Sequence, residues 1–319
     1  MLFHVRAKHG GTVLIDHNGV RKLNMRCDSI LSNTVYPSWH PTENIVAFSS
    51  NKTGQAFHMV NNQKVEVIDF GSDLVLFDVE KGVLSNILKT KDNMETFPSW
   101  SPDGRKLYYC NARVPELALL PDSTHSNYVL SKYDSIHYDI MSISFDKEKR
   151  TFGQPVVEVN CDSMNKSATV PRVSPDGKFL LFTLGDYGQF HIWHNSADLY
   201  IKNLESNEIM PLTFANSEKA ESYHTWSSNG RWIVFVSRRE NGSFSRVFIS
   251  YFDRNGNAHK AFLLPQEDPE HNLLRLKSYN VPELSKDPVR FSYNELKEVI
   301  YNDNDMHNVI YQDLGTQDK

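Results

Sequence analysis

Two histidines in this sequence are spaced as metal ligands often are. His191 and His194 are separated by two residues within the segment 185–197. A structural or catalytic zinc site needs further ligands, and this extended segment supplies no carboxylate or third histidine at a suitable spacing. The histidine pair alone therefore predicts no metal site.

Two aspartates recur at one position of a repeated motif. Asp103 and Asp176 each stand third in a Ser-Pro-Asp-Gly tetrapeptide, at 101–104 and 174–177. Ser first, Pro second and Gly fourth are the preferences of a type I turn, in which the aspartate bonds to the backbone. We expect turn residues and not catalytic carboxylates. The sequence also contains no Gly-x-Ser-x-Gly and no phosphate-binding loop motif, so it predicts no catalytic residue and a protein that is not an enzyme.

The tetrapeptide belongs to a longer unit that occurs four times, at 36–48, 97–109, 170–182 and 223–235. Each unit reads as a strand, a tight turn and a second strand that is apolar at nearly every position, which is typical of a sheet packed on both faces. An alternating third strand and a short fourth strand follow. Four-stranded units repeated along a chain predict an all-β propeller of antiparallel blades.

The two chain ends predict a fifth, composite blade. Residues 2–7 align with the second strand of a unit, and residues 281–285 resemble the first strand. Pairing them in one sheet would remove the edges that an open fan exposes. The sequence thus predicts five blades over residues 1–285, with six blades as the alternative. In the tail, 286–319, Ser292 and Glu295 form a capping box that predicts a short helix packed outside the propeller.

The units are longer than compact blades, and the excess lies mainly between second and third strands, at 51–72, 111–138 and 185–197. In antiparallel blades these connections share one face, and long loops on a rigid scaffold are where binding residues usually lie. The alternative is that they only pack the loops. The candidate binding residues on this face are His58, His125, Tyr128, His137, Tyr187, His191, Trp193, His194, Arg238 and Arg239.

Composition excludes several classes of protein. The net charge is -5 with acidic and basic residues interspersed, so the basic face that nucleic acid requires is missing. No apolar run approaches the ~18 residues of a membrane span. Residues 1–7 lack the features of a secretion signal. Three distant cysteines, Cys27, Cys110 and Cys161, leave room for at most one disulfide.

The Ser-Pro-Asp-Gly hairpins with a preceding Pro-x-Trp, followed by Asp-Leu-Tyr-type strands, resemble the repeats of TolB-like, WD40-like propellers of the bacterial envelope. The resemblance spans residues 1–285. More narrowly, the segments 6–11, 186–194 and 264–269 resemble a subgroup often labelled cytochrome c biosynthesis protein. The resemblance implies a periplasmic or cell-envelope location. Longer relatives carry a Cys-x-x-Cys-His motif for haem c ahead of the propeller, and since this sequence has none, no cofactor is expected in this chain.

Together these features predict a non-catalytic scaffold that binds a protein or peptide partner in the bacterial cell envelope through its loop-rich face. The alternative is an enzyme, or a redox or haem-associated component, with its site at the mouth of the central channel and its cofactor domain missing from this chain. That alternative expects polar residues with shifted pKa values, or a metal, at the propeller axis.

Overall fold

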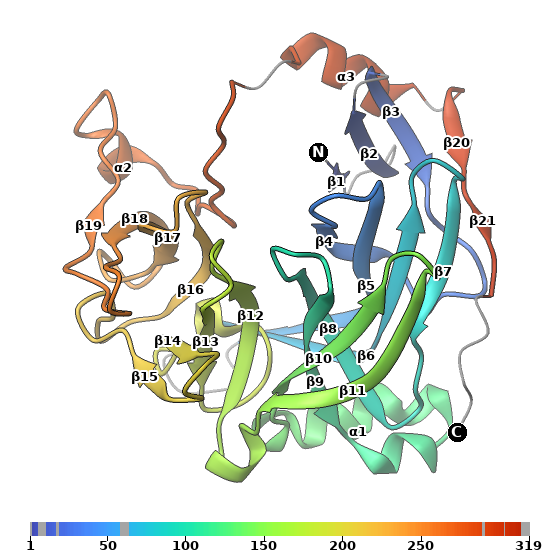
Figure 1. Ribbon diagram of the computed structural model, residues 1–319, viewed down its shortest axis with the longest axis horizontal. Helices are drawn as coiled ribbons and strands as arrows, with labels where there is room; N and C mark the ends of the chain where they lie inside the picture. Colours follow the sequence, from blue (N-terminus) through green and yellow to red (C-terminus); the bar gives the residue numbers. More distant parts are fainter. Residues whose placement is uncertain are drawn as a thin grey trace.

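Five β-sheets stand side by side around a common centre (Figure 1). The computed structural model describes residues 2–5, 11–16, 19–57, 64–288, 291–302 and 304–313. Four sheets have four strands and one has five, and the sequential strands within each sheet pair antiparallel. The all-β propeller with five blades is therefore confirmed. We number the blades 1 to 5 in chain order.

Each blade is formed from consecutive strands of the chain, and the C-terminal tail adds one strand to each of blades 1 and 2. Blade 1 contains β1 (Leu2–Val5), β2 (Gly11–Asp16), β3 (Gly19–Asn24) and β20 (Met306–Asn308). Blade 2 contains β4 (Thr34–Trp39), β5 (Ile45–Phe57), β6 (Val65–Asp78), β7 (Val83–Leu88) and β21 (Ile310–Tyr311). Blade 3 contains β8 (Asn93–Trp100), β9 (Lys106–Arg113), β10 (Asp139–Asp146) and β11 (Thr151–Val159). Blade 4 contains β12 (Ser167–Val173), β13 (Phe179–Gly185), β14 (Asp198–Asn203) and β15 (Ile209–Pro211). Blade 5 contains β16 (Glu221–Trp226), β17 (Trp232–Ser237), β18 (Arg246–Tyr251) and β19 (Phe262–Leu263).

Blade 1 is composite, but not in the predicted way. The expected strand at 281–285 is wrong, because that segment forms no strand and instead lies beside β16, where the Thr225 hydroxyl donates to the Pro282 carbonyl at 2.7 Å. The C-terminal tail supplies β20, which pairs parallel to β3 at the opposite edge of the sheet. Val309 and Tyr311 beside it pack on the apolar cluster of blades 1 and 2. The burial of these two side chains favours pairing of the tail strand at the outer edge of the sheet, on β3, over pairing at the inner edge, on β1.

The tail also contains the predicted helix. Helix α3 (Tyr293–Tyr301) begins with a capping box, in which the Ser292 hydroxyl accepts from the Glu295 amide and the Glu295 carboxylate accepts from the Ser292 amide. Two shorter helices are α1 (His125–Ser131) and α2 (His271–Leu274). No helix in the described residues is long and apolar enough to cross a membrane. The three cysteines are free thiols.

The innermost strand of each of blades 2 to 5 bulges at one equivalent position. Tyr36, Phe97, Val170 and Tyr223 all have φ between 50° and 56°, and the pairing register shifts around each of them. Positive φ is costly for aromatic and β-branched residues, so the burial of these side chains must offset the strain. All four contact one apolar cluster at the centre of the propeller, where the rings of Tyr36 and Phe97 lie 4.3 Å apart.

The Ser-Pro-Asp-Gly turns have the predicted bonding. The Ser101 hydroxyl donates to Asp103 at 2.6 Å and accepts from the Lys106 amide, and the same pattern recurs at Ser174. The hydrogen bond from Ser101 lowers the pKa of Asp103, as expected for a structural carboxylate. In the unit that has Glu43 in place of glycine, the His40 Nδ1 atom accepts from the Thr42 and Glu43 amides instead.

A matched pair of turn glycines tests how closely His40 packs against the Ser101 turn. Gly104 and Gly177 have φ of +69° and +74°, but a Cβ at Gly104 would lie 2.3 Å from His40 Nε2, whereas a Cβ at Gly177 would meet nothing within 4 Å. We expect Gly177→Ala to lower the free energy of unfolding by about 1 kcal/mol through backbone strain. Gly104→Ala should cost about 1–3 kcal/mol more because His40 must move. Urea unfolding of both variants measures the difference, and equal losses would contradict it.

In the segment 51–72, expected as a loop, the described residues instead extend two paired strands. Strands β5 and β6 continue to Phe57 and from Val65, and Figure 1 shows the light-blue strands of blade 2 running from this blade toward β12. Beyond Val65, Lys64 Nζ donates to Ser243 Oγ in the β17–β18 connection at 2.6 Å. We call residues 51–57 and 64–72 the strap, since they link blade 2 to blade 5.

The strap and the other long connections pack on one another. Ile68 of the strap, Leu117 and Val129 of the 114–138 segment, and Ile192 of the β13–β14 connection belong to the same central cluster as the bulged inner strands. The connections of this face therefore cover the centre with apolar side chains. This cluster lies where the alternative hypothesis from the sequence expected its site.

Candidate functional site

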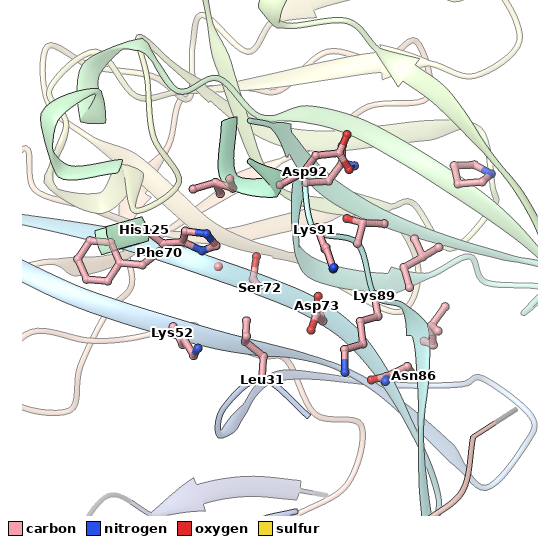
Figure 2. A pocket seen from close by; sticks show the side chains of 18 of the residues that line it. Leu31, Lys52, Phe70, Ser72, Asp73, Asn86, Lys89, Lys91, Asp92 and His125 are labelled. Atoms are coloured by element: carbon pink, nitrogen blue, oxygen red, sulfur yellow. The ribbon is translucent and has the colours of Figure 1, made fainter. Parts of the chain in front are cut away.

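A large hollow lies between blades 2 and 3 (Figure 2). Its volume is about 1220 Å³, which exceeds the ~300–1,000 Å³ typical of small-molecule sites. Residues 70–73 and 86–93, from β6, β7 and the connection to β8, line one wall. Residues 117–126 and 150–155, from the segment before α1 and from β11, line the other. We call it the inter-blade groove.

Three lysines surround an acidic residue in this groove. Figure 2 shows the side chains of Lys52, Lys89 and Lys91 around Asp73. All three lysines are exposed, and Lys89 Nζ donates to the Ser29 carbonyl at 3.2 Å. Asp73 is buried, which raises its pKa to about 6 although Lys89 and Lys52 lower it. The groove lining also includes Arg150, Asp92 and Asp122, so it carries four cations and three carboxyls, an excess of one positive charge.

Two further carboxyls lie behind the groove, between the same blades. Burial raises the pKa of Glu95 to about 8, although the Thr90 hydroxyl donates to its Oε1 atom at 2.8 Å. Its Oε2 atom has no hydrogen-bond partner among the described residues. Burial also raises the pKa of Asp69 to about 7, although Asn51 and Thr53 donate to it. These acids were not predicted from the sequence. The available signal was a carboxyl placed inside an otherwise apolar strand.

Four of the predicted binding residues lie apart from one another. His125 lines the groove, and its Nε2 atom lies 3.1 Å from the Leu120 carbonyl. Tyr128 packs against the central cluster. His137 Nδ1 lies 3.0 Å from the Asp162 carboxylate. Arg239 donates to Glu221 at 3.0 Å and to Ser237, so it supports blade 5. His58 lies outside the described residues.

The structure brings the other predicted residues together where the β13–β14 connection meets the strap. His191 is buried, with its two ring nitrogens 3.1 Å from Thr169 Oγ1 and 3.1 Å from the Tyr187 carbonyl. Burial and the neighbouring His194 lower the pKa of His191 to about 3, so the ring is neutral at pH 7. Both of its nitrogens are occupied, which leaves no lone pair for a metal ion.

His194 instead bonds to the strap. Its Nε2 atom lies 3.0 and 3.1 Å from the two carboxylate oxygens of Glu66, and both residues are almost fully buried. The Tyr187 hydroxyl also donates to Glu66 at 3.4 Å, and its ring lies 4.7 Å from that of His194. No group of three His, Cys, Asp or Glu side chains in the described residues could hold a metal ion. The arrangement is a buried polar contact between blades 2 and 4.

Trp193 and Arg238 form the last contact of this region. The Arg238 guanidinium lies 3.1 Å from the centre of the Trp193 ring, a stacked cation–π geometry. Both residues were predicted on the loop-rich face, and the structure shows that they meet. Their partners could not be predicted, because they come from blades 4 and 5.

These features define an all-β propeller whose candidate binding sites lie between blades and at the meeting point of its long connections. No protein-family model matches the sequence, and no curated protein matches it either. Solved structures with a similar fold include TolB from Acinetobacter baumannii, at 19% identity and a TM-score of 0.49 over 81% of this chain. An oligogalacturonate lyase in complex with manganese matches at 13% identity and 0.49 over 79%, and the periplasmic gluconolactonase of Pseudomonas aeruginosa at 14% and 0.44 over 81%.

The likeness to these proteins is one of fold. This chain covers 51% of the TolB chain, 59% of the lyase and 65% of the gluconolactonase, so it spans about half the length of that TolB. None of these three structures concerns cytochrome c biosynthesis. Two of the three are named as enzymes, and a shared fold does not decide the function.

Proposed function

We propose that this propeller is a non-catalytic scaffold that binds an extended, acidic segment of a protein partner in the inter-blade groove. The observation that carries the proposal is the size of the groove together with the exposed amines of Lys52, Lys89 and Lys91. An extended chain with carboxylate side chains would complement these charges, which favours fast association and a defined orientation. Electrostatic repulsion from these three lysines would disfavour the binding of basic segments.

The outer edges of two blades of this propeller accept added strands from the C-terminal tail, and this supports an extended conformation of the bound partner. β20 and β21 each add a parallel strand to the outer edge of a blade, on β3 and β7. In blade 3, β11 pairs with β10 on one side only in the described part of the chain, and Val156 and Val157 on it are 57% and 51% exposed. An exposed strand edge next to a groove suits the addition of a peptide strand.

The resemblance to TolB-like propellers supports a partner in the bacterial envelope, and a periplasmic location is part of the proposal. The enzyme alternative keeps one observation in its favour, which is the raised pKa of Asp73 in the groove wall. The axis, where that alternative expected its site, carries apolar side chains.

Selection from a library of short random peptides tests the proposal. We expect acidic peptides to be enriched, and the double variant Lys89→Glu with Lys91→Glu to weaken a selected peptide about tenfold or more, because both charges face the groove. Fluorescence anisotropy of the labelled peptide measures the affinity. Lys178→Glu, an exposed lysine in a blade 4 turn, serves as the control and should bind as the parent protein does.

Two results would overturn the proposal. One is a selected peptide that binds the groove variant as tightly as the parent protein. The other is a peptide recovered cleaved or chemically altered, since mass spectrometry of the bound peptide would then identify an enzyme. Recovery of the intact peptide together with weaker binding to the groove variant supports the scaffold.

A further inference from the structure

A second hollow of about 370 Å³ lies where the strap meets blades 4 and 5. Its lining residues are Lys64, Trp193, Asn195, Lys219, Arg238 and Gly242. None of them lines the inter-blade groove. The volume is in the range of small-ligand sites and well below that of the groove.

All the charged residues in the described lining of this hollow are cations. Lys64, Lys219 and Arg238 contribute three cations, and no described lining residue is a carboxylate. Arg238 is buried, Lys219 is half-buried and Lys64 is exposed, and a bound anion would reduce the repulsion among these three like charges.

Arg238 is the most informative of the three. It is 5% exposed, and its Nε atom has no hydrogen-bond partner in the described part of the protein. Burial lowers its pKa to about 10, so the guanidinium remains charged at pH 7. Two other arginines of blade 5 differ, because the half-buried Arg239 pairs with Glu221 and the buried Arg246 donates to backbone carbonyls, including that of Arg275 at 2.7 Å.

The Arg238 guanidinium carbon lies over the Trp193 ring, 3.1 Å from the ring centre, and this contact restricts the position of the guanidinium. A fixed guanidinium presents a pair of donors that matches two oxygens of a carboxylate or phosphate. Lys64 and Lys219 act as point charges beside it, and the exposed Asn195 amide adds a further donor. Lys64 Nζ is positioned by its hydrogen bond to Ser243 Oγ at 2.6 Å.

We propose that this hollow is a binding site for a small oxyanion with at least two negative charges, held by Arg238, Lys219 and Lys64. The two chemical sources of such an anion are a polycarboxylate and a phosphate monoester. The ligand contacts side chains from blades 2, 4 and 5, so its binding ties the strap to the opposite side of the propeller. The site is independent of the inter-blade groove and of any peptide bound there.

Titration calorimetry and thermal unfolding with citrate, inorganic phosphate and acetate test the site at constant ionic strength. We expect citrate or phosphate to bind and to raise Tm by about 3 °C near saturation, because a ligand of the folded state stabilises it by mass action. Acetate, with one charge, should not. Citrate alone would identify a polycarboxylate site, and phosphate alone a phosphate site.

Lys219→Gln should weaken the bound anion about tenfold, since it removes one of three charges with little loss of packing. Arg238→Gln should abolish binding. Lys132→Gln, an exposed lysine of the same face, is the control and should leave the affinity unchanged. Citrate and phosphate also stabilise proteins by exclusion from the surface, so only the difference between variants counts. Equal Tm shifts in the parent protein and Lys219→Gln, or no calorimetric binding, would overturn the proposal.

Discussion

Between pH 6.5 and pH 8, the free energy of unfolding of this protein should fall by about 2–3 kcal/mol. Burial raises the pKa of Glu95 from 4.5 to about 8 and that of Asp69 from 3.8 to about 7. In this range the folded protein still holds protons that the unfolded chain has released. A rise in pH therefore favours the unfolded chain, and the stabilisation present at low pH is lost as pH passes through the folded-state values.

The histidines set the lower end of this pH range. Burial lowers the pKa of His191 and of His224 from 6.5 to about 3. Below pH 6.5 the unfolded chain binds protons that these buried rings exclude, so their contribution to stability increases as pH rises to 6.5. The histidines and the buried acids act in opposite directions there. At pH 6.5 the histidines of the unfolded chain are still half protonated, so they offset a part of the loss that the acids cause, and the acids dominate between pH 6.5 and pH 8.

Glu95→Gln isolates the larger contribution. The amide keeps an oxygen that accepts from Thr90 but does not ionise in this pH range. Between pH 6.5 and pH 8, the free energy of unfolding of the variant should therefore fall by about 2 kcal/mol less than that of the parent protein. Urea unfolding at several pH values measures the slope. Asp122→Asn, at a side chain 91% exposed, is the control. An unchanged slope in Glu95→Gln would show that this carboxyl does not titrate as described.

The parts of the fold that depend on local sequence could be predicted. The Ser101 and Ser174 turns, the apolar strands after them and the Ser292 capping box each depend on residues within a few positions of one another. The fifth blade was predicted because both chain ends lacked partners. The strand that completes this blade was predicted wrongly, since Pro282 and its neighbours resemble an inner strand. Which tail segment pairs with the blade depends on how Tyr311 packs against blade 2.

The candidate sites depend on contacts between distant blades, and these explain what was missed. Trp193 and Arg238 were predicted as separate surface residues, but their stacking requires that blades 4 and 5 be neighbours. Lys64 and Glu66 gave no signal, because 51–72 was interpreted as a loop. Their alternation of polar and apolar residues continues a strand, and this strand carries both residues to blades 4 and 5.

The largest single loss of stability is expected at the contact between the strap and blade 4. His194→Ala removes the imidazole that bonds both oxygens of Glu66, and leaves the carboxylate with the Tyr187 hydroxyl at 3.4 Å. Leaving a buried charged group without its partner costs about 3–5 kcal/mol. We expect urea unfolding at pH 7 to show this loss, and hydrogen exchange to show faster exchange of the amides of β5 and β6.

A double variant separates the cost of the unpaired carboxylate from the loss of packing. Glu66→Leu combined with His194→Leu replaces both groups by apolar side chains of similar size, and should cost far less than His194→Ala because no buried polar group is left unsatisfied. His259→Ala breaks a matched but exposed pair, in which His259 lies 3.5 Å from Asp253, and should cost under ~1 kcal/mol. If the double variant is as unstable as the single one, shape and not hydrogen bonding holds the strap. Because Lys64 is two residues from Glu66, loosening this contact should also weaken the anion bound beside Arg238.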